Sequence, residues 1–291
     1  MSIALAAGAA FCFAGAGILF RRGVASNSII TAIMMSLPVI VVVTGIFAIV
    51  DWPDTVSAAS FGWFVLGGVV GDGIGRAAYI GGVERLGPSR ATPIHTAAYP
   101  FVAVLGGIVF LSEDVPPSRF AGAALIVAGI IAVTGSPHAE PGETRKRFRW
   151  TWWYLYPVVA GVGFGVSDIM RKFALDGTPN PSFGAAVGSL TALLIWALAV
   201  GSSPRLRVMA KPGPGSGWFV LAGVVIAIGL IAVFTALEAD DVSVVGPIIS
   251  AQPIVVVGLS ALFLRGHEVL SARLVIGAVL TVAGVISLAL T

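Results

Sequence analysis

Gly122-Ala-Ala-Leu-Ile-Val-Ala-Gly129 is repeated 155 residues later in the chain as Gly277-Ala-Val-Leu-Thr-Val-Ala-Gly284. Both copies are apolar apart from one threonine, and both begin and end with glycine. Nearer the N-terminus, Val65-Leu-Gly-Gly-Val-Val70 matches Val220-Leu-Ala-Gly-Val-Val225 at the same spacing. Because the match extends over most of each half, the sequence predicts an internal duplication, the signature of a repeat architecture.

The duplication divides the chain into a first repeat over residues 1–136 and a second repeat over residues 153–291. Residues 137–152 join the two and are rich in arginine and lysine, so they are predicted to form a basic linker loop. Two matched carboxylates, Glu113 and Glu268, precede the two glycine-bounded segments. A carboxylate in that position can stabilise the positive end of a helix, so both are predicted to be structural.

The composition places most of the chain in lipid. Of the residues, 57% are hydrophobic and only 11% are charged, with a mean hydropathy of +0.98, whereas a soluble domain has roughly 25% charged residues. A spanning helix needs about 20 mostly apolar residues. Nine uncharged runs have about this length or a little less: 1–20, 29–50, 91–112, 120–134, 150–167, 177–204, 212–237, 242–264 and 274–291. A tenth, 61–82, contains Asp72 and Arg76.

These runs predict an all-α integral membrane protein with ten transmembrane helices. Strands of a membrane barrel alternate apolar and polar residues, whereas the runs at 39–43 and 125–133 do not alternate. Each repeat has five spans, an odd number, so the second repeat enters the membrane from the opposite side. Inverted repeats of this kind, with the binding site between them, are a recurring transporter architecture.

One set of motifs resembles a known family. Glu84-Arg-Leu-Gly-Pro-Ser-Arg-Ala91 is followed by a proline-bearing span, then by Phe110-Leu-Ser-Glu113 and a glycine-rich span. This order is similar to that of the EamA-type repeat of the drug/metabolite transporter superfamily. The resemblance implies ten helices around a central cavity, with the fifth and tenth at the periphery. Members of the family export amino acids, metabolites or drugs, and others move nucleotide sugars or sugar phosphates.

The basic residues predict which side of the membrane each loop faces. Loops at odd positions carry thirteen lysines and arginines, and loops at even positions carry three: Arg119, Arg171 and Lys172. An excess of such residues in short loops marks the cytoplasm. The charge count therefore predicts a cytoplasmic linker and extracytoplasmic termini, whereas the resemblance implies cytoplasmic termini. The net charge of +3 and the pI near 9.4 follow from these loops, so we expect no nucleic-acid partner.

The run over residues 61–82 contains the first candidate site. Asp72, Arg76 and Tyr79 share one face of the predicted helix. A charge at the centre of a bilayer costs a few kcal/mol and normally faces a cavity or a partner. The matched positions of the second repeat are Ala227 and Ile231, so the architecture does not need these charges in both halves. We interpret the pair as part of a substrate site; the alternative is an intrahelical ion pair that only stabilises the fold.

The next span contributes a polar stripe. Four side chains lie at helical spacing on one face: Thr92, His95, Thr96 and Tyr99. Its counterpart in the second repeat has Ser250 and Gln252. The stripe is predicted to line the cavity, with His95 as a proton-sensitive group; the alternative is hydrogen bonding between helices. Asp168 is a further cavity candidate, although it is expected near the membrane edge, where contact with water would explain it equally well.

Two kinds of small or rigid residue recur in the spans. Prolines occur in both matched fourth spans, where each removes a backbone donor and should bend its helix: Pro93, Pro100, Pro247 and Pro253. The bends could gate the cavity or merely shape it. Glycines are spaced four apart in two other spans, which favours close helix packing: Gly67, Gly71 and Gly75, then Gly161 and Gly165.

The resulting hypothesis is a secondary transporter or exporter of small polar metabolites that works by alternating access in the plasma membrane. No Walker motif is present, so the energy would come from an ion gradient or from the substrate itself, and a proton or another ion could be coupled. No cofactor, metal or catalytic residue is predicted, since His95, His138 and His267 fall in separate segments and Cys12 is the single cysteine. The alternatives are an intramembrane enzyme and a membrane scaffold or receptor that does not transport.

Overall fold

Helices make up all the regular secondary structure in the described part of the computed structural model, which covers every residue except 25, 87, 135–151, 253, 256–271 and 290–291. The first half contains α1 (Ser2–Val24), α2 (Ile29–Val50), α3 (Ala58–Gly67), η1 (Gly68–Gly75), α4 (Arg76–Leu86), α5 (Pro88–Leu111) and α6 (Pro117–Thr134). The second half contains η2 (Trp152–Tyr154), α7 (Leu155–Gly177), α8 (Pro181–Ser202), α9 (Pro204–Met209), α10 (Gly217–Ala239), α11 (Val242–Ile249) and α13 (Ala272–Ala289).

Most of these helices match the predicted spans. Six are long and apolar enough to cross a membrane, judged by length and composition: Ser2–Val24, Ile29–Val50, Ala58–Tyr79, Ile94–Leu111, Pro181–Ser202 and Gly217–Ala239. The remaining predicted spans correspond to α6, α7, α11 and α13, and the second half of the run at 242–264 lies outside the described residues. The all-α membrane class is confirmed.

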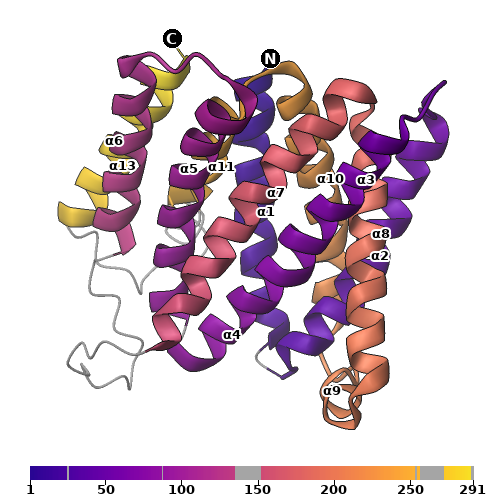
Figure 1. The fold of residues 1–291 in the computed structure, drawn as a ribbon. Coiled ribbons are helices and arrows are strands. Elements are labelled where there is room, and N and C mark those ends of the chain that lie inside the picture. The colour runs from indigo at the N-terminus through magenta and orange to yellow at the C-terminus, as the bar shows by residue number, and fades with distance from the viewer. Residues whose placement is uncertain (25, 87, 135–151, 253, 256–271, 290–291) are drawn as a thin grey trace.

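Each of several helices of the first half packs against a helix of the second half, and the pairs are related by the repeat. α1 packs on α10, and its second-half counterpart α7 packs on α3, the first-half counterpart of α10. α2 packs on α8, and α6 packs on α13. Figure 1 shows that α1 starts at the end of the bundle where α7 finishes. This is the arrangement that an inverted duplication produces.

The core lies between the halves, and the outer surface of the bundle is apolar. Phe64 of the first half and Phe183 and Phe234 of the second belong to this core, and the ring centroid of Phe64 lies 6.1 Å from each of the other two. Large apolar side chains such as Val50 and Leu198 point outward and are 82% and 73% exposed. An apolar exterior of this extent suits contact with lipid.

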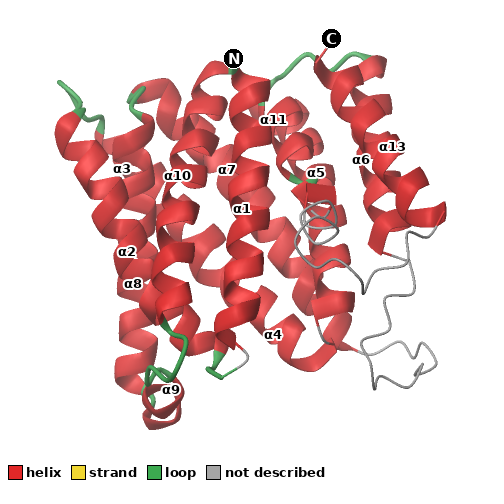
Figure 2. Cartoon of the chain, turned by 180° about the vertical axis from the view of Figure 1, so that it is seen from behind, coloured by secondary structure: helices red, strands yellow, loops and turns green. Residues whose placement is uncertain are grey.

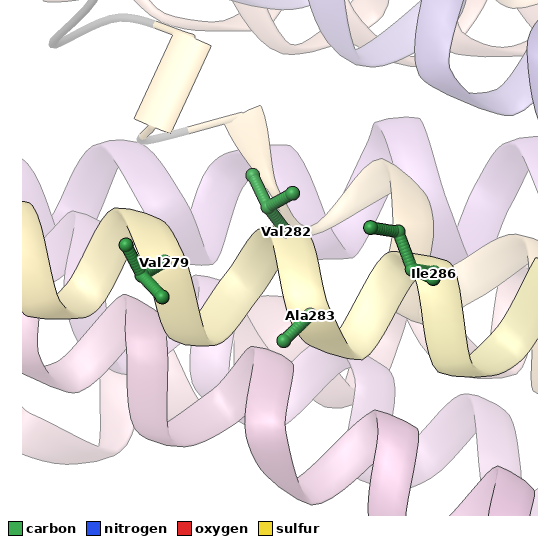
Figure 3. Close-up of a pocket in the computed structure, with 4 residues that line it drawn as sticks. All are labelled: Val279, Val282, Ala283 and Ile286. Carbon is green, nitrogen blue, oxygen red and sulfur yellow. The ribbon is translucent and has the colours of Figure 1, made fainter.

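A shallow groove lies on the outward face of α13. It has a volume of about 380 Å³ and is lined by four apolar side chains: Val279, Val282, Ala283 and Ile286. Figure 3 shows these side chains along one stretch of the helix. The groove is part of the apolar exterior and contains none of the predicted site residues.

The glycine positions confirm the predicted close packing. A Cβ atom at Gly71 would lie 2.5 Å from the Oγ atom of Ser167 in α7. A Cβ atom at Gly161 would lie 2.7 Å from the backbone oxygen of His95 in α5. Both distances are below van der Waals contact, so α7 approaches its two neighbours at positions where only glycine fits without rearrangement.

Glu113 has a structural role, although not on the helix that follows it. Its two carboxylate oxygens accept hydrogen bonds from the backbone N–H groups of Val242 and Ser243, at 2.8 and 3.0 Å. These are the first residues of α11, so Glu113 caps a helix of the other repeat rather than α6. The sequence could not indicate this, because the cap joins residues 129 and 130 positions apart. Glu268 lies outside the described residues.

The two chain ends lie at the same end of the bundle. The start of α1 and the end of α13 are there, and α9 lies at the opposite end (Figures 1 and 2). α9 carries Arg205 and Arg207, which belong to the predicted cytoplasmic set. The prediction that Arg171 lies in a loop is wrong, because α7 continues to Gly177 and buries this side chain. Without Arg171, the loops at even positions carry fewer basic residues, so the excess in the loops at odd positions becomes larger.

The charge bias leads to a prediction about orientation. Alkaline phosphatase fused after Thr291 should be active, because it folds only outside the cytoplasm, and green fluorescent protein fused there should not fluoresce. The same reporters inserted after Met209, at the α9 end, should give the opposite result, since short basic loops remain in the cytoplasm. Fluorescence at Thr291 together with phosphatase activity at Met209 would show that the orientation is reversed while leaving the fold unchanged.

Candidate functional site

The predicted span at 61–82 is one continuous helix, but its centre is wider than an α-helix. Residues Gly68–Gly75 form a π-helix, and the N–H group of Arg76 bonds to the carbonyl of Gly71, five residues earlier. Four of these eight residues are glycine, which lowers the preference for regular α-helix. The indole N–H group of Trp196 donates to the backbone carbonyl of Asp72 at 3.3 Å. π-helical turns are rare and occur frequently at functional sites.

Asp72 is the centre of an ionic network. An Oδ1–Nη2 contact of 2.5 Å joins it to Arg76, one turn later on the same helix. Its other oxygen, Oδ2, lies 3.2 Å from Nη2 of Arg171 in α7. Arg171 also binds Asp168 through Nη1, at 2.8 Å. Tyr99 in α5 donates its hydroxyl hydrogen to the remaining oxygen of Asp168, so every carboxylate oxygen of the network has a partner.

The network is buried and balanced in charge. The side chains of Asp168, Arg171 and Asp72 are 3%, 8% and 10% exposed, and that of Arg76 is 20% exposed. Removing an ion from water costs several kcal/mol, and good geometry with further hydrogen bonds is needed to offset that cost. Two carboxylates face two guanidinium groups here. The guanidinium of Arg171 also stacks on the ring of Phe234, 5.1 Å from its centroid.

The network joins the two halves of the chain. Asp72, Arg76 and Tyr99 come from the first half, and Asp168 and Arg171 come from the second. The expectation that contact with water would explain Asp168 is wrong, because Asp168 is buried within α7 and bound by Arg171 and Tyr99. The uncharged run that predicts this span ends at Ser167, because the charged residues begin at Asp168. The i,i+3 spacing of Asp168 and Arg171 was the signal that could have identified both as a helical ion pair.

Three rings lie beside the network. The ring of His95 lies 5.2 Å from the ring of Tyr79 and 5.2 Å from that of Phe164, measured between centroids. Phe164 also reaches the helix that carries Asp72, since a Cβ atom at Gly75 would lie 3.6 Å from it. We call Tyr79, His95 and Phe164 the aromatic wall. The structure thus brings together two predicted site residues, Tyr79 and His95, with a third residue that the sequence analysis missed.

The remaining candidates of α5 differ in how far the structure describes them. Thr96 is buried in α5. Thr92 and Pro93 belong to the same helix, but their side chains are outside the described part of the chain. Pro100 is buried inside α5, which continues from Pro88 to Leu111 without interruption. Bending of this helix stays a prediction.

The second-repeat candidates lie near the network but do not join it. Ser250 is buried and donates to the carbonyl of Gly246 at 2.8 Å, and Gln252 is half-buried. Pro247 lies within α11, which ends two residues later, and Pro253 is outside the described residues. A Cβ atom at Gly246 would lie 3.9 Å from the hydroxyl of Tyr99, so α11 passes beside the network. Among the described residues, neither Ser250 nor Gln252 makes a polar contact with the charged groups of the ionic network.

Comparison with known proteins agrees with this architecture. The model of the EamA-like transporter family matches the chain twice, over residues 1–135 and 151–290. An uncharacterized transporter of Archaeoglobus fulgidus is 25% identical over 294 aligned positions, which cover 100% of this chain and 98% of that protein. A protein of known crystal structure has the same fold, with a TM-score of 0.76 and 17% identity over 99% of this chain and 96% of that one. The chain belongs to the EamA-like transporter family.

Proposed function

We propose that this protein is a secondary transporter that moves a small polar metabolite across the plasma membrane by alternating access. The observation that supports this most directly is the buried network of Asp72, Arg76, Asp168 and Arg171 between the two halves of the chain. Inverted-repeat transporters bind their substrates at this interface, near the middle of the membrane. The sequence has no Walker motif, so an ion gradient or the substrate gradient itself is the proposed source of energy.

The geometry suggests which contacts would change during transport. The Asp72–Arg76 pair lies within one helix and would move as a unit. The Asp72–Arg171 contact, at 3.2 Å, joins α7 to the π-helical segment of the other repeat. Relative movement of the two halves would therefore lengthen the Asp72–Arg171 contact and leave the Asp72–Arg76 contact intact. A substrate bound between the halves could replace the contact that is lost.

Two alternatives fit the observations less well. An intramembrane enzyme needs a nucleophile, an acid or a base directed at one reacting atom, whereas both carboxylates here are held by arginines. A scaffold that binds no small molecule would gain little from buried ions, and a receptor is distinguished from a transporter by the uptake test below. Replacing a buried ion pair with apolar residues is often neutral or stabilising, so a network that is kept in a membrane interior favours a binding function.

The test begins with ligand binding and continues to transport. Purified protein should unfold at a higher temperature in the presence of its substrate, since binding at 100 times Kd stabilises by about 2.7 kcal/mol. The metabolite that gives the largest shift should then enter proteoliposomes containing the protein, saturably and without ATP. A metabolite that stabilises the protein but is not taken up would support the receptor alternative, and one that is chemically converted would support the enzyme.

A further inference from the structure

The hydrogen bonds of the ionic network leave one member with unused donors. Both oxygens of Asp72 and both of Asp168 have partners, and both terminal nitrogens of Arg171 are bound. Arg76 donates through Nη2 alone, to Asp72. Its Nε–H group is buried and has no hydrogen-bond partner. A buried donor without a partner costs about 1–3 kcal/mol, and this cost would be removed by an acceptor that binds beside Arg76.

Arg76 is also the most accessible member of the network. Its side chain is 20% exposed, against 3–10% for the other three charged residues. A guanidinium group presents its N–H donors in a planar fork that matches a carboxylate with two parallel hydrogen bonds. In the other three members every terminal oxygen or nitrogen has a partner, whereas Arg76 is partly exposed and has donors without one.

We propose that Arg76 is the anion receptor of the transport site and that the substrate it binds carries a carboxylate group. This inference rests on the proposed function and specifies the class of substrate. Tyr79 lies three residues after Arg76 and therefore on the same helix face. It belongs to the aromatic wall with His95 and Phe164. A carboxylate bound at Arg76 would place the body of the substrate against this wall, so a ring or another apolar group next to the carboxylate fits best.

The charge balance limits the anion to a single charge. With two carboxylates and two guanidinium groups the network is neutral, so a bound carboxylate adds one buried negative charge. A phosphate adds about 1.5–2 charges, and each uncompensated charge at membrane depth costs a few kcal/mol. One positive charge arriving with the carboxylate would restore neutrality. A proton could supply it, or an ammonium group on the substrate itself.

Five probes with the same ring test the assignment on the full-length protein in detergent: benzoate, phenylalanine, phenyl phosphate, benzylamine and benzyl alcohol. We expect benzoate or phenylalanine to raise the unfolding temperature, and the other three probes to have no comparable effect. Phenylalanine acting alone would identify the substrate's ammonium group as the added positive charge, and benzoate acting would show that this group is not required. Both results support a carboxylate at Arg76.

Variants then connect the effect to one side chain. Arg76→Gln should weaken binding of the active probe at least tenfold, whereas Arg76→Lys, which keeps the charge without the fork, should weaken it less. Asp72 keeps Arg171 as a partner in both variants, and unfolding without ligand checks that they fold. Arg22→Gln is the matched control, because Arg22 is an exposed residue that stacks on Trp218.

Three outcomes would overturn the inference. The first is stabilisation by benzylamine, benzyl alcohol or phenyl phosphate that equals the effect of the carboxylates. The second is unchanged binding of benzoate or phenylalanine by Arg76→Gln. The third is stabilisation by none of the five probes while another polar metabolite stabilises the protein and is transported. That last result would reject the substrate class and leave the proposed function standing, whereas a metabolite that binds without being transported would reject the function itself.

Discussion

Arg171→Met should lower the free energy of unfolding by about 3–5 kcal/mol, the range measured when one partner of a buried ion pair is removed. Arg171 is the only described side chain that binds both Asp72 and Asp168. Without it, Asp168 would keep only the hydroxyl of Tyr99, and two buried carboxylates would face a single guanidinium group. Methionine fills a similar volume without a charge, so the effect should come from electrostatics rather than from a cavity.

Unfolding of the purified protein by denaturant in detergent would measure this loss. A second substitution provides the critical comparison: Asp168→Asn added to Arg171→Met removes the unpaired carboxylate and should recover at least half of the lost stability. Lys172→Met is the neighbouring control, because Lys172 donates to the backbone carbonyls of Leu237 and Asp240 at the end of α10, and neither carboxylate of the network binds it. It should cost about 1 kcal/mol or less, as expected for a cation at a helix C-terminus. Wild-type stability of Arg171→Met would contradict the network's structural role.

The sequence was sufficient to predict those features that depend on local pattern. The repeated glycine-bounded segments and the long apolar runs predicted an all-helical membrane protein with two related halves, and both are confirmed by the structure and the family match. The Asp72–Arg76 pair was also predictable, because an i,i+4 spacing on a helix brings the two side chains together whatever surrounds them. The pair is present at 2.5 Å.

Features that depend on contacts between distant segments were not predictable. The apolar pattern ends the sixth predicted span before the first charged residue, since an unpaired charge is costly in lipid. That criterion fails in α7, where Asp168 and Arg171 are paired with residues of two other helices. Arg171 therefore belongs to the network, although the apolar pattern predicts that it lies in a loop. The same reason explains why Phe164 was missed: its contact with His95 joins two helices.

The π-helix at Gly68–Gly75 is a third feature of this kind. Two of its four glycines, Gly71 and Gly75, belong to the stripe whose spacing predicts close helix packing, and the structure confirms this packing at Gly71. Glycine content alone does not indicate a wider turn, because each extra backbone group must find a partner elsewhere. Here the indole of Trp196, 124 positions away, supplies one of them. The helix around Asp72 is thus shaped by the second repeat.

Asp72→Asn and Arg76→Gln should affect stability unequally. Asp72 binds two arginines, so its neutralisation leaves the network with an excess positive charge and should cost about 3 kcal/mol, a value typical of a broken buried pair. Arg76→Gln leaves Asp72 bound to Arg171, and the side chain that is lost is partly exposed. Its cost should be nearer 1 kcal/mol, as for ion pairs that water can reach.

The double variant Asp72→Asn/Arg76→Gln separates a structural ion pair from a binding site. It keeps the Asp168–Arg171 pair and restores a neutral network, so it should be more stable than the sum of the single losses predicts, by about 1–3 kcal/mol of coupling. If the pair only stabilises the fold, substrate binding should return together with stability. If Arg76 contacts the substrate, stability should return while binding and transport stay lost, because the guanidinium group that binds the substrate is absent. Normal substrate binding by a stable double variant would therefore show that the site lies elsewhere between the two halves.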